Sequence, residues 1–302
     1  MTVNLNRYRL LFFCFVALLF NCCSLFGQQI PLLEPANQEY KEFEAKGTTP
    51  NKLRRALDTI QYPWSEYSKG ALGNALWRTV YLSPADEAVL PSLIKLPANS
   101  SGQTRAELDY LLKLQNTRTK QEIERAEYIA NIGSWPNISN PTDPDYVENR
   151  QNLYYILNIA TGQQHDFKNY PATTALLLNC IQDIRVAEFR LKQHFKRPRP
   201  YHLEPALKPL TRINSPAFPS GHSLWAYTEA YIFGELFPEK RQDFIKAAAE
   251  VRWSRELMGI HYPSDNEASR VIGWHLLKYW YKNPVFIADL NHAKAEWDEI
   301  KK

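Results

Sequence analysis

Helix start and stop signals recur along this chain, whereas the alternation of apolar and polar residues that is typical of strands is scarce. Ser83 followed by Pro84 is a helix start with proline at the first helical position. The segments Thr104–Glu107 and Thr119–Glu122 each predict a capping box. These signals predict an all-α fold.

The same signals give approximate bounds for the later helices. We expect helices over residues 119–133, 146–161, 172–196, 220–236, 239–258, 264–282 and 286–301, loops over 134–145 and 201–218, and short helices within 28–100 that wrap the core. The chain has 44% apolar residues, which is ample core material. We therefore predict one helical-bundle domain over residues 28–302.

The first 27 residues are typical of a secretory signal peptide. Arg7 and Arg9 precede an apolar run, Leu10–Phe20, that is too short to span a bilayer alone, and Gly27 is a small residue at a plausible cleavage point. The sequence thus predicts a periplasmic or secreted protein. Lipid attachment at Cys22 or Cys23, or an uncleaved anchor, remains open as an alternative.

Beyond the leader, the composition narrows the classes of partner and cofactor. Cys180 is the one cysteine after residue 27, so no intramolecular disulfide is expected, and its apolar neighbours favour a buried, inert thiol. The net charge is +4, and the sequence has no run of Lys and Arg that would indicate nucleic-acid binding. No spacing of metal ligands is present, so no metal cofactor is expected. A homo-oligomer is possible.

Lys192 and Arg199 form the first of three motifs that carry chemistry. Lys192 falls in the last turns of a predicted helix, and Arg199 stands between Pro198 and Pro200, which stiffen the backbone around it. A stiffly held guanidinium loses little entropy when it grips an oxyanion. Taken alone, this motif would favour a solvated basic helix end.

The second motif, Pro219-Ser220-Gly221-His222, lies where a loop enters a helix. The free N–H groups and positive dipole end of a helix N-terminus attract anions. Gly221 allows close approach of the backbone, and Ser220 can cap the helix or donate to an anion. A plain serine cap beside a solvent-facing His222 is the structural alternative.

The third motif combines Arg255, His261 and Asp265. His261 falls on a connection between two predicted helices, and Asp265 lies in the first turn of the second one. A carboxylate at this spacing can accept a hydrogen bond from one imidazole nitrogen and leave the other free as a nucleophile. The alternative is an acidic helix cap beside a packed histidine.

Together the motifs resemble the signature of the type 2 phosphatidic-acid-phosphatase superfamily, PAP2, which includes bacterial class A nonspecific acid phosphatases and vanadium haloperoxidases. The likeness covers every signature position, lies within 192–265, and extends loosely over residues 170–302. It implies the helical bundle of that superfamily, with the class A acid phosphatases as the nearest group. Their gap between the first two motifs often carries cysteines, and this chain has none there.

The resemblance also implies a role for each motif residue. His261 would attack phosphorus to form a phosphohistidine, Asp265 would orient His261, and His222 would protonate the leaving oxygen and then activate water. Phosphate would be bound by Lys192, Arg199, Ser220, Gly221 and Arg255. Three cations can stabilise the charge that other phosphoryl-transfer enzymes neutralise with Mg²⁺. The implied function is hydrolysis of small phosphate monoesters by a secreted or periplasmic acid phosphatase.

Three other functions are compatible with the same motif residues. A vanadium-dependent haloperoxidase would hold vanadate with the same cations, although such chains are usually much longer. A lipid-phosphate phosphatase is a second alternative, but its membrane members have several spanning helices, and the sequence shows no long apolar segment after the leader. A non-catalytic phosphate-binding protein is the third.

Overall fold

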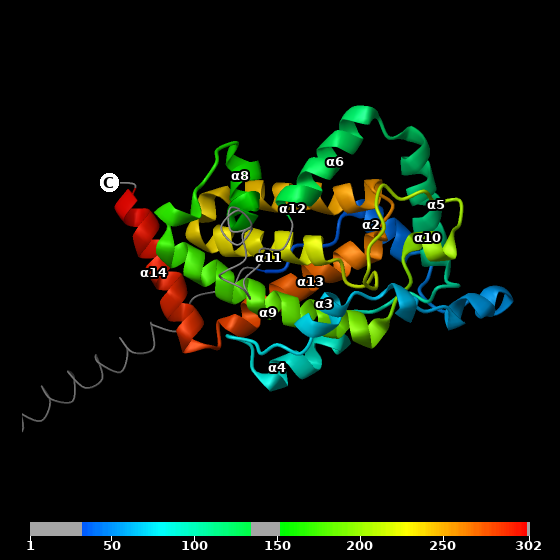
Figure 1. Cartoon of the computed structure of the whole chain (residues 1–302), viewed down its shortest axis with the longest axis horizontal. Helices are drawn as coiled ribbons and strands as arrows, with labels where there is room; N and C mark the ends of the chain where they lie inside the picture. The colour runs from blue at the N-terminus through cyan, green and yellow to red at the C-terminus, as the bar shows by residue number, and fades with distance from the viewer. Residues whose placement is uncertain (1–31, 134–151, 301–302) are drawn as a thin grey trace, which may run out of the picture. The chain divides into compact units, whose positions relative to one another are not determined.

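The computed structural model describes residues 32–133 and 152–300 of the chain (Figure 1). Residues 35–302 form one compact unit, which holds all of the helices named below, and residues 1–34 form a separate one. The described residues contain α-helices and 3₁₀-helices and no strand, which confirms the predicted all-α fold. Within the same residues, no helix is both long enough and apolar enough to cross a membrane. The predicted signal peptide and the 134–145 loop lie outside the described residues.

Short helices occupy the first part of the chain, as expected. They are α2 (Gln38–Glu44), η2 (Lys52–Thr59), η3 (Trp64–Glu66), α3 (Lys69–Asn74), α4 (Pro84–Val89) and η4 (Leu90–Leu93). The helix start at Ser83 is confirmed, because its side chain accepts from the backbone N–H of Asp86 and Pro84 takes the first helical position.

Two longer helices follow, α5 (Gly102–Thr117) and α6 (Lys120–Ile132). The capping box from Thr119 to Glu122 is confirmed at the start of α6. The box predicted from Thr104 to Glu107 is wrong. The cap of α5 is Ser101, whose side chain accepts from the backbone N–H of Thr104. Glu107 is one turn inside the helix, completely buried, and its carboxylate accepts from residues far along the chain instead.

The middle of the chain holds η5 (Asn152–Tyr154), α8 (Tyr155–Thr161), η6 (Phe167–Asn169) and α9 (Pro171–Phe195). The helix expected over 146–161 therefore begins as a 3₁₀ turn in its described part. The long helix expected over 172–196 is confirmed as α9. It ends because Lys196 adopts the left-handed conformation, with φ of 50°, and Pro198 cannot continue a helix.

One predicted loop is partly helical. The segment expected as a loop over 201–218 begins with a single helical turn, α10 (Pro200–Leu203). Pro200 presets the helical φ angle, and the ring nitrogen Nδ1 of His202 accepts from the backbone N–H of Arg199. The turn fixes Arg199 at its N-terminal end.

The last four α-helices match the expected ranges to within about three residues. They are α11 (Gly221–Leu236), α12 (Arg241–Leu257, after the 3₁₀ turn η7, Pro238–Lys240), α13 (Pro263–Trp280) and α14 (Pro284–Ile300). α11 is the central helix and packs against α12, α13, α9 and α8, as Figure 1 shows. Buried residues, most of them apolar, lie on all sides of α11, as expected of a surrounded helix.

α11 and α13 approach each other closely where Gly273 faces Thr228. A β-carbon on Gly273 would lie 2.8 Å from Oγ1 of Thr228, so the contact requires glycine. The two helices begin side by side, because the N–H of Ser220 donates to the carbonyl of Asp265 across 3.2 Å. The C-terminal ends of α9 and α12 meet them there. All three motifs are thus at one end of the bundle.

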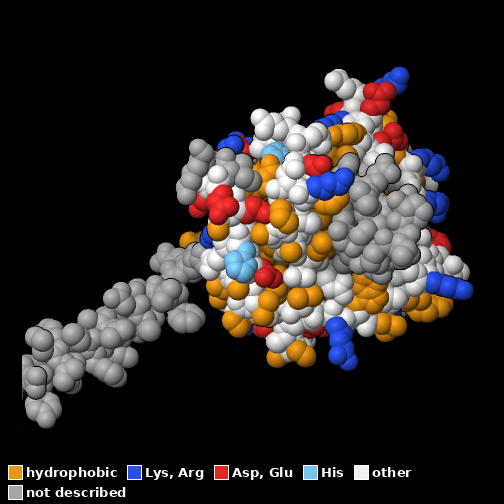
Figure 2. Space-filling model, turned by 60° about the vertical axis from the view of Figure 1, so that its left-hand side comes forward, with side chains coloured by type: hydrophobic (Ala, Val, Ile, Leu, Met, Phe, Trp, Pro, Cys, Tyr) orange, Lys and Arg blue, Asp and Glu red, His pale blue; other side chains and the backbone are white. Residues whose placement is uncertain are grey.

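The surface is mixed in charge. On the face drawn in Figure 2, Lys and Arg side chains lie scattered among acidic and apolar ones. This distribution is typical of a solvated surface. The cations that the motifs single out are buried instead.

Candidate active site

Lys192 is buried in the last turn of α9, with 1% of its surface exposed. Its Nζ donates to the carbonyls of Pro216 and Pro219, at 2.7 and 2.6 Å, and lies 3.6 Å from the carboxylate of Glu188. Burial lowers the pKa of Lys192, and the nearby carboxylate of Glu188 opposes that shift. The ammonium group is fixed against the loop that leads into α11.

Arg199 is also buried and uses all of its nitrogens. Nε donates to the carbonyl of Ser215 at 2.9 Å, and Nη1 donates to the carbonyl of Ile260 at 2.9 Å. Nη1 also lies 2.8 Å from Nε2 of His261, and Nη2 donates to the hydroxyl of Ser215 at 3.3 Å. The first motif is therefore in direct contact with the histidine of the third.

The pairing of His261 with Asp265 is as the spacing predicts. Nδ1 of His261 lies 3.0 Å from Oδ2 of Asp265, which also accepts from the backbone N–H of Tyr262 at 3.0 Å. A carboxylate only accepts and a guanidinium only donates, so Nδ1 carries the proton and the lone pair is on Nε2, facing Arg199. Burial and the charges of Arg199 and then Lys192 lower the pKa of His261, so the ring is neutral.

His222 lies at the start of α11 and faces α6. Its Nε2 lies 3.3 Å from the carbonyl oxygen of Ala130, an acceptor, so this nitrogen carries a proton. Burial and the charge of Arg255 lower the pKa of His222 to about 3. In the free protein this histidine is neutral as well.

The start of α11 shows why serine and glycine stand there. Ser220 caps the helix through its hydroxyl, which accepts from the N–H of Ser223 at 3.4 Å. A β-carbon on Gly221 would lie 2.6 Å from Cδ of Glu188, so any larger residue would have to displace that carboxylate. Gly221 thereby lets the helix start pack directly on α9.

Arg255 completes the set of cations from the last turn of α12. Its Nη2 donates to the carbonyl of Ala126, on α6, at 3.1 Å. Burial lowers the pKa of Arg255 to about 10, which leaves the guanidinium charged at physiological pH. Its charge, like those of Lys192 and Arg199, lowers the pKa of His261. The three cations therefore converge on one imidazole.

Residues 169–287 match the family model described as the PAP2 superfamily. This segment is therefore similar to the PAP2 superfamily. It contains all eight motif residues described above. The family match agrees with the resemblance seen in the motifs, and the helices that carry the PAP2 motifs are α9 and α11 to α13.

Curated relatives are similar to part of the chain. A non-specific acid phosphatase of Providencia stuartii is 28% identical over 141 residues, which cover 45% of this chain and 57% of the relative. A non-specific acid phosphatase of Salmonella typhimurium is 28% identical over 130 residues, or 41% of this chain and 52% of the relative. The chain thus spans a little over half the length of these relatives.

Solved structures with a similar fold are more distant. A transmembrane PAP2 type phosphatidylglycerolphosphate phosphatase from Bacillus subtilis has a TM-score of 0.43, at 22% identity over 64% of this chain and 90% of that one. A bacterial vanadium-dependent iodoperoxidase has a TM-score of 0.45, at 20% identity over 61% of this chain and 49% of that one. At these scores the likeness supports no conclusion about activity.

Two charged residues behind the PAP2 motifs were not singled out by the sequence. Arg197 donates to Oδ1 of Asp265 at 2.6 Å, and Glu107 accepts from Ser264 at 2.7 Å and lies 3.4 Å from Arg197. In the sequence, Arg197 is one more basic residue at the end of a predicted helix, and Glu107 is part of an expected capping box. The one available signal was that Arg197 shares the proline-stiffened segment of Arg199.

The PAP2 site offers nitrogen donors and few oxygen ligands. Among residues 32–133 and 152–300, no group of three His, Cys, Asp or Glu side chains is arranged to hold a metal ion. Chemically, the arrangement can bind a tetrahedral oxyanion with three cations and present a neutral imidazole nitrogen to it. A second histidine, His222, lies close enough that a proton on its ring would lower the pKa of His261.

Proposed function

We propose that this protein is a phosphatase that hydrolyses small phosphate monoesters through a phosphohistidine on His261, without a metal ion. One observation carries the proposal. His261 is held with its Nδ1 on Asp265 and its Nε2 lone pair toward Arg199, where the charges of three cations converge. A fixed tautomer and a concentrated positive charge are what in-line attack on a phosphate ester requires.

The reaction we propose has two balanced steps. In the first, Nε2 of His261 forms a bond to phosphorus while the bond to the ester oxygen breaks, and His222 transfers a proton to that oxygen. In the second, His222 removes a proton from water, the water oxygen bonds to phosphorus, and the phosphorus–nitrogen bond breaks. Asp265 stabilises the positive charge on His261 between the two steps.

His222 can act as the acid only if it is charged when substrate is bound. The free protein keeps it neutral, because burial and cations lower its pKa to about 3. A bound phosphate dianion adds two negative charges beside it and raises that pKa. Substrate binding would therefore cause His222 to take up the proton that it then gives to the leaving group.

The location of the protein belongs to the same proposal. The apolar leader supports export, and the curated relatives are bacterial acid phosphatases. We propose a periplasmic or secreted enzyme. Fractionation of the source cells, followed by mass spectrometry of the mature N-terminus, tests this and distinguishes cleavage near Gly27 from lipid attachment at Cys22 or Cys23.

A single assay tests the activity against its alternatives. We expect purified protein to release phosphate from an aryl phosphate, and we expect vanadate to inhibit that release. Halide oxidation with vanadate and peroxide, with no phosphate release, would instead indicate a haloperoxidase. Preference for a phosphorylated lipid in mixed micelles would indicate a lipid phosphatase, and binding of phosphate without turnover would indicate a binding protein.

A further inference from the structure

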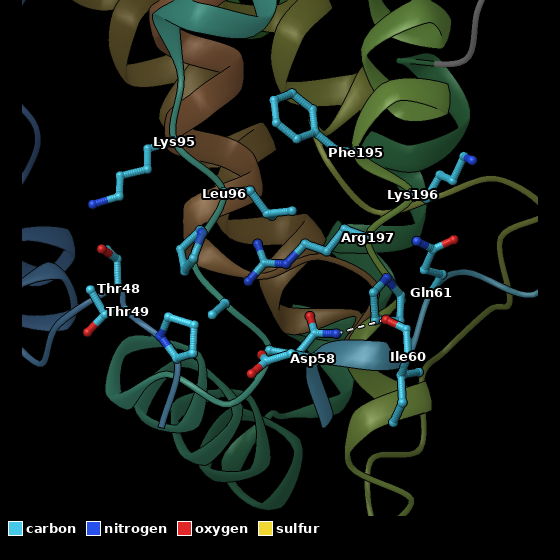
Figure 3. Close-up of a pocket in the computed structure, with 15 residues that line it drawn as sticks. Thr48, Thr49, Asp58, Ile60, Gln61, Lys95, Leu96, Phe195, Lys196 and Arg197 are labelled. Atoms are coloured by element: carbon cyan, nitrogen blue, oxygen red, sulfur yellow. Dashed lines mark hydrogen bonds between the residues drawn. The ribbon is translucent and has the colours of Figure 1, made fainter. Parts of the chain in front are cut away.

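Arg197 connects a surface pocket to the interior of the candidate active site. Figure 3 shows this side chain extending across a pocket of about 440 Å³, lined also by Leu96, Phe195 and Ile60. Arg197 itself is 1% exposed. Its guanidinium reaches Asp265 beyond the pocket wall, so one side chain contacts both places.

Hydrogen bonds and aromatic contacts hold the guanidinium of Arg197 in one orientation. Nη1 donates to Oδ1 of Asp265 at 2.6 Å and to the hydroxyl of Ser264 at 2.7 Å. The guanidinium carbon lies 3.8 Å from the ring centre of Tyr262 and 5.9 Å from that of Phe218. The contacts with the aromatic faces and the two hydrogen bonds from Nη1 together fix its orientation.

Glu107 holds the opposite side of this network. Its Oε1 accepts from the N–H of Ser264 at 3.0 Å, and its Oε2 accepts from the hydroxyl of Ser264 at 2.7 Å. Gln103 also donates to it, at 3.0 Å. Glu107 lies 3.4 Å from Nη2 of Arg197, whereas Asp265 lies 2.6 Å from Nη1. The guanidinium is therefore shared between two buried carboxylates and is closer to Asp265.

We propose that Arg197 is a positioning residue for phosphohistidine chemistry, which holds Asp265 charged and correctly turned toward His261, and that Glu107 anchors Arg197 and Ser264 in place. This inference rests on the proposed function, because it assigns a role within that reaction. Arg197 touches neither His261 nor the oxyanion space, so it acts through Asp265. Oδ1 of Asp265 bonds to Arg197, and that leaves Oδ2 for His261.

The charges around Asp265 explain why it needs this partner. The groups that face it are Arg197, Arg199 and the backbone N–H of Tyr262, with His261 on its other oxygen, Glu107 behind Arg197, and the charge of Lys192 further off. Burial raises the pKa of Asp265, and Arg197 is the group that opposes this most. A protonated Asp265 would no longer accept from Nδ1 of His261 as an anion.

The central experiment compares Arg197→Lys with Arg197→Met. Methionine removes the charge, so we expect the acid limb of the kcat/KM profile to move to higher pH by about one unit or more. At low pH we expect kcat to fall by about 10- to 100-fold, the size typical of outer-layer partners of a functional group, while KM changes much less. Lysine keeps the charge, so its acid limb should stay near that of the wild type. An unmoved limb in both variants would overturn the proposal.

A double-mutant cycle separates this role from a merely structural one. In an Asp265→Asn background, Arg197→Met should lower kcat by no more than about threefold, because the residue through which it acts is already neutral. Full additivity of the two losses would contradict the inference. Arg190, which lies on α9 just before the segment of Arg197 and is half exposed, provides the control, and Arg190→Ala should leave the profile unchanged in both backgrounds.

The pocket offers an independent test by chemical rescue. Arg197→Ala joins the pocket to the space beside Asp265, so methylguanidinium in the assay should restore part of the lost kcat, and neutral methylurea should not. Failure of rescue in protein that remains folded, judged by its melting curve, would count against a role for the charge. If Arg197→Ala does not fold, the lysine and methionine variants still decide.

A readout that needs no catalysis keeps the two proposals distinct. If the wild type shows no phosphate release, the proposed function fails, and nitrogen-15 NMR of histidine-labelled protein still tests Arg197. We expect the Nδ1–H signal of His261 to be lost at a higher pH in Arg197→Met than in the wild type or in Arg197→Lys. Identical titrations in all three proteins would overturn the inference by itself.

Discussion

Nη1 of Arg199 lies 2.8 Å from Nε2 of His261, the nitrogen that carries the lone pair. The cation that would bind the phosphate is thus in contact with the nucleophilic nitrogen. An incoming oxyanion competes for the same N–H, and its capture of Arg199 would expose Nε2 at the moment the substrate arrives. Binding and activation are therefore expected to be coupled through this one contact.

Asp265→Asn is expected to lower turnover and leave affinity nearly intact. An amide can donate to the imidazole and select the wrong tautomer, so kcat should fall by about 10²- to 10⁴-fold, by analogy with a Ser-His-Asp triad. Arg199→Ala should instead weaken phosphate binding directly, because charge-assisted hydrogen bonds are lost. Phosphate inhibition constants measured beside kcat for both variants check this. Equal weakening of phosphate binding in both would show that Asp265 maintains the pocket and does not only orient His261.

His222→Ala is expected to show an effect that depends on the leaving group. A nitrophenolate leaves with little protonation, whereas an alkoxide needs a proton from the acid. The loss of kcat should therefore be at least about tenfold larger for an alkyl phosphate than for nitrophenyl phosphate. Acid-quench trapping should still label His261 in this variant with the aryl ester, and His261→Ala should abolish labelling. Equal losses with both esters would exclude His222 as the general acid.

Anion binding is expected to take up protons at acidic pH. The pKa of His222 is lowered to about 3 in the free protein, so at pH 5 the ring is neutral, and a bound dianion raises its pKa. Sulfate is a suitable probe because it stays a dianion there. Calorimetry in buffers of different protonation enthalpy should give an uptake approaching about one proton per sulfate. The uptake should largely disappear in His222→Ala, and proton release in the wild type would contradict the assignment.

The lowered pKa of His222 also predicts how the stability of the protein changes with pH. Below the ordinary histidine pKa of about 6.5, the unfolded chain binds a proton at residue 222 that the folded protein does not. The free energy of unfolding contributed by His222 should therefore decrease as the pH falls from about 6.5 toward 3. Melting curves at pH 7 and pH 5 check this, and sulfate should narrow the difference between them.

Gly221→Ala is expected to be harmful because of Glu188. The new β-carbon would meet the buried carboxylate, 2.6 Å from its Cδ, and displace this partner of Lys192. We expect destabilisation of about 1–3 kcal/mol, the usual cost of overpacking, with a lower kcat/KM. Gly70→Ala is the control, since nothing lies within 4 Å of its β-carbon position. Combining Gly221→Ala with Glu188→Ala should restore part of the stability, and no restoration would point to a backbone cause.

Dialysis against EDTA is expected to leave the rate nearly unchanged. Three cations converge on His261, and no group of three potential metal-ligating side chains was found in the described parts of the chain. The charge on the transferred phosphoryl group would be stabilised by Lys192, Arg199 and Arg255. Loss of activity that returns with Mg²⁺ or Zn²⁺ would contradict this prediction.

Helix positions could be predicted because their signals are local. The proline that begins α13 and the left-handed Lys196 that follows α9 affect only the backbone next to them. Most such local signals can be found in the sequence. The turn of α10 lies in a segment expected as a loop, because a proline soon after a helix is as typical of the end of that helix as of the start of a new one, and Pro200 begins a new one. Proline is compatible with both positions, and only the fold decides between them.

The candidate site was predictable to the extent that its residues form motifs. His261 and Asp265 are four residues apart, so their contact follows from local geometry. Glu107 is 90 residues before Arg197, and no local pattern ties an acid in α5 to the segment after α9. The capping box expected at Thr104 was wrong for the same reason: the tertiary partner of Glu107 outweighs its local one.

Each buried cation of this site has hydrogen-bond partners within the protein. Lys192, Arg199 and Arg255 each donate to backbone carbonyls, those of residues 216 and 219, 215 and 260, and 126. Inorganic phosphate carries much the same charge as the ester it came from, so a set of uncompensated cations would retain the product. Here each carbonyl can again accept a hydrogen bond from its cation as phosphate leaves. We therefore expect the rate of product departure, which limits turnover in many enzymes, to be set in part by the loops and by helix α6, which supply these oxygens.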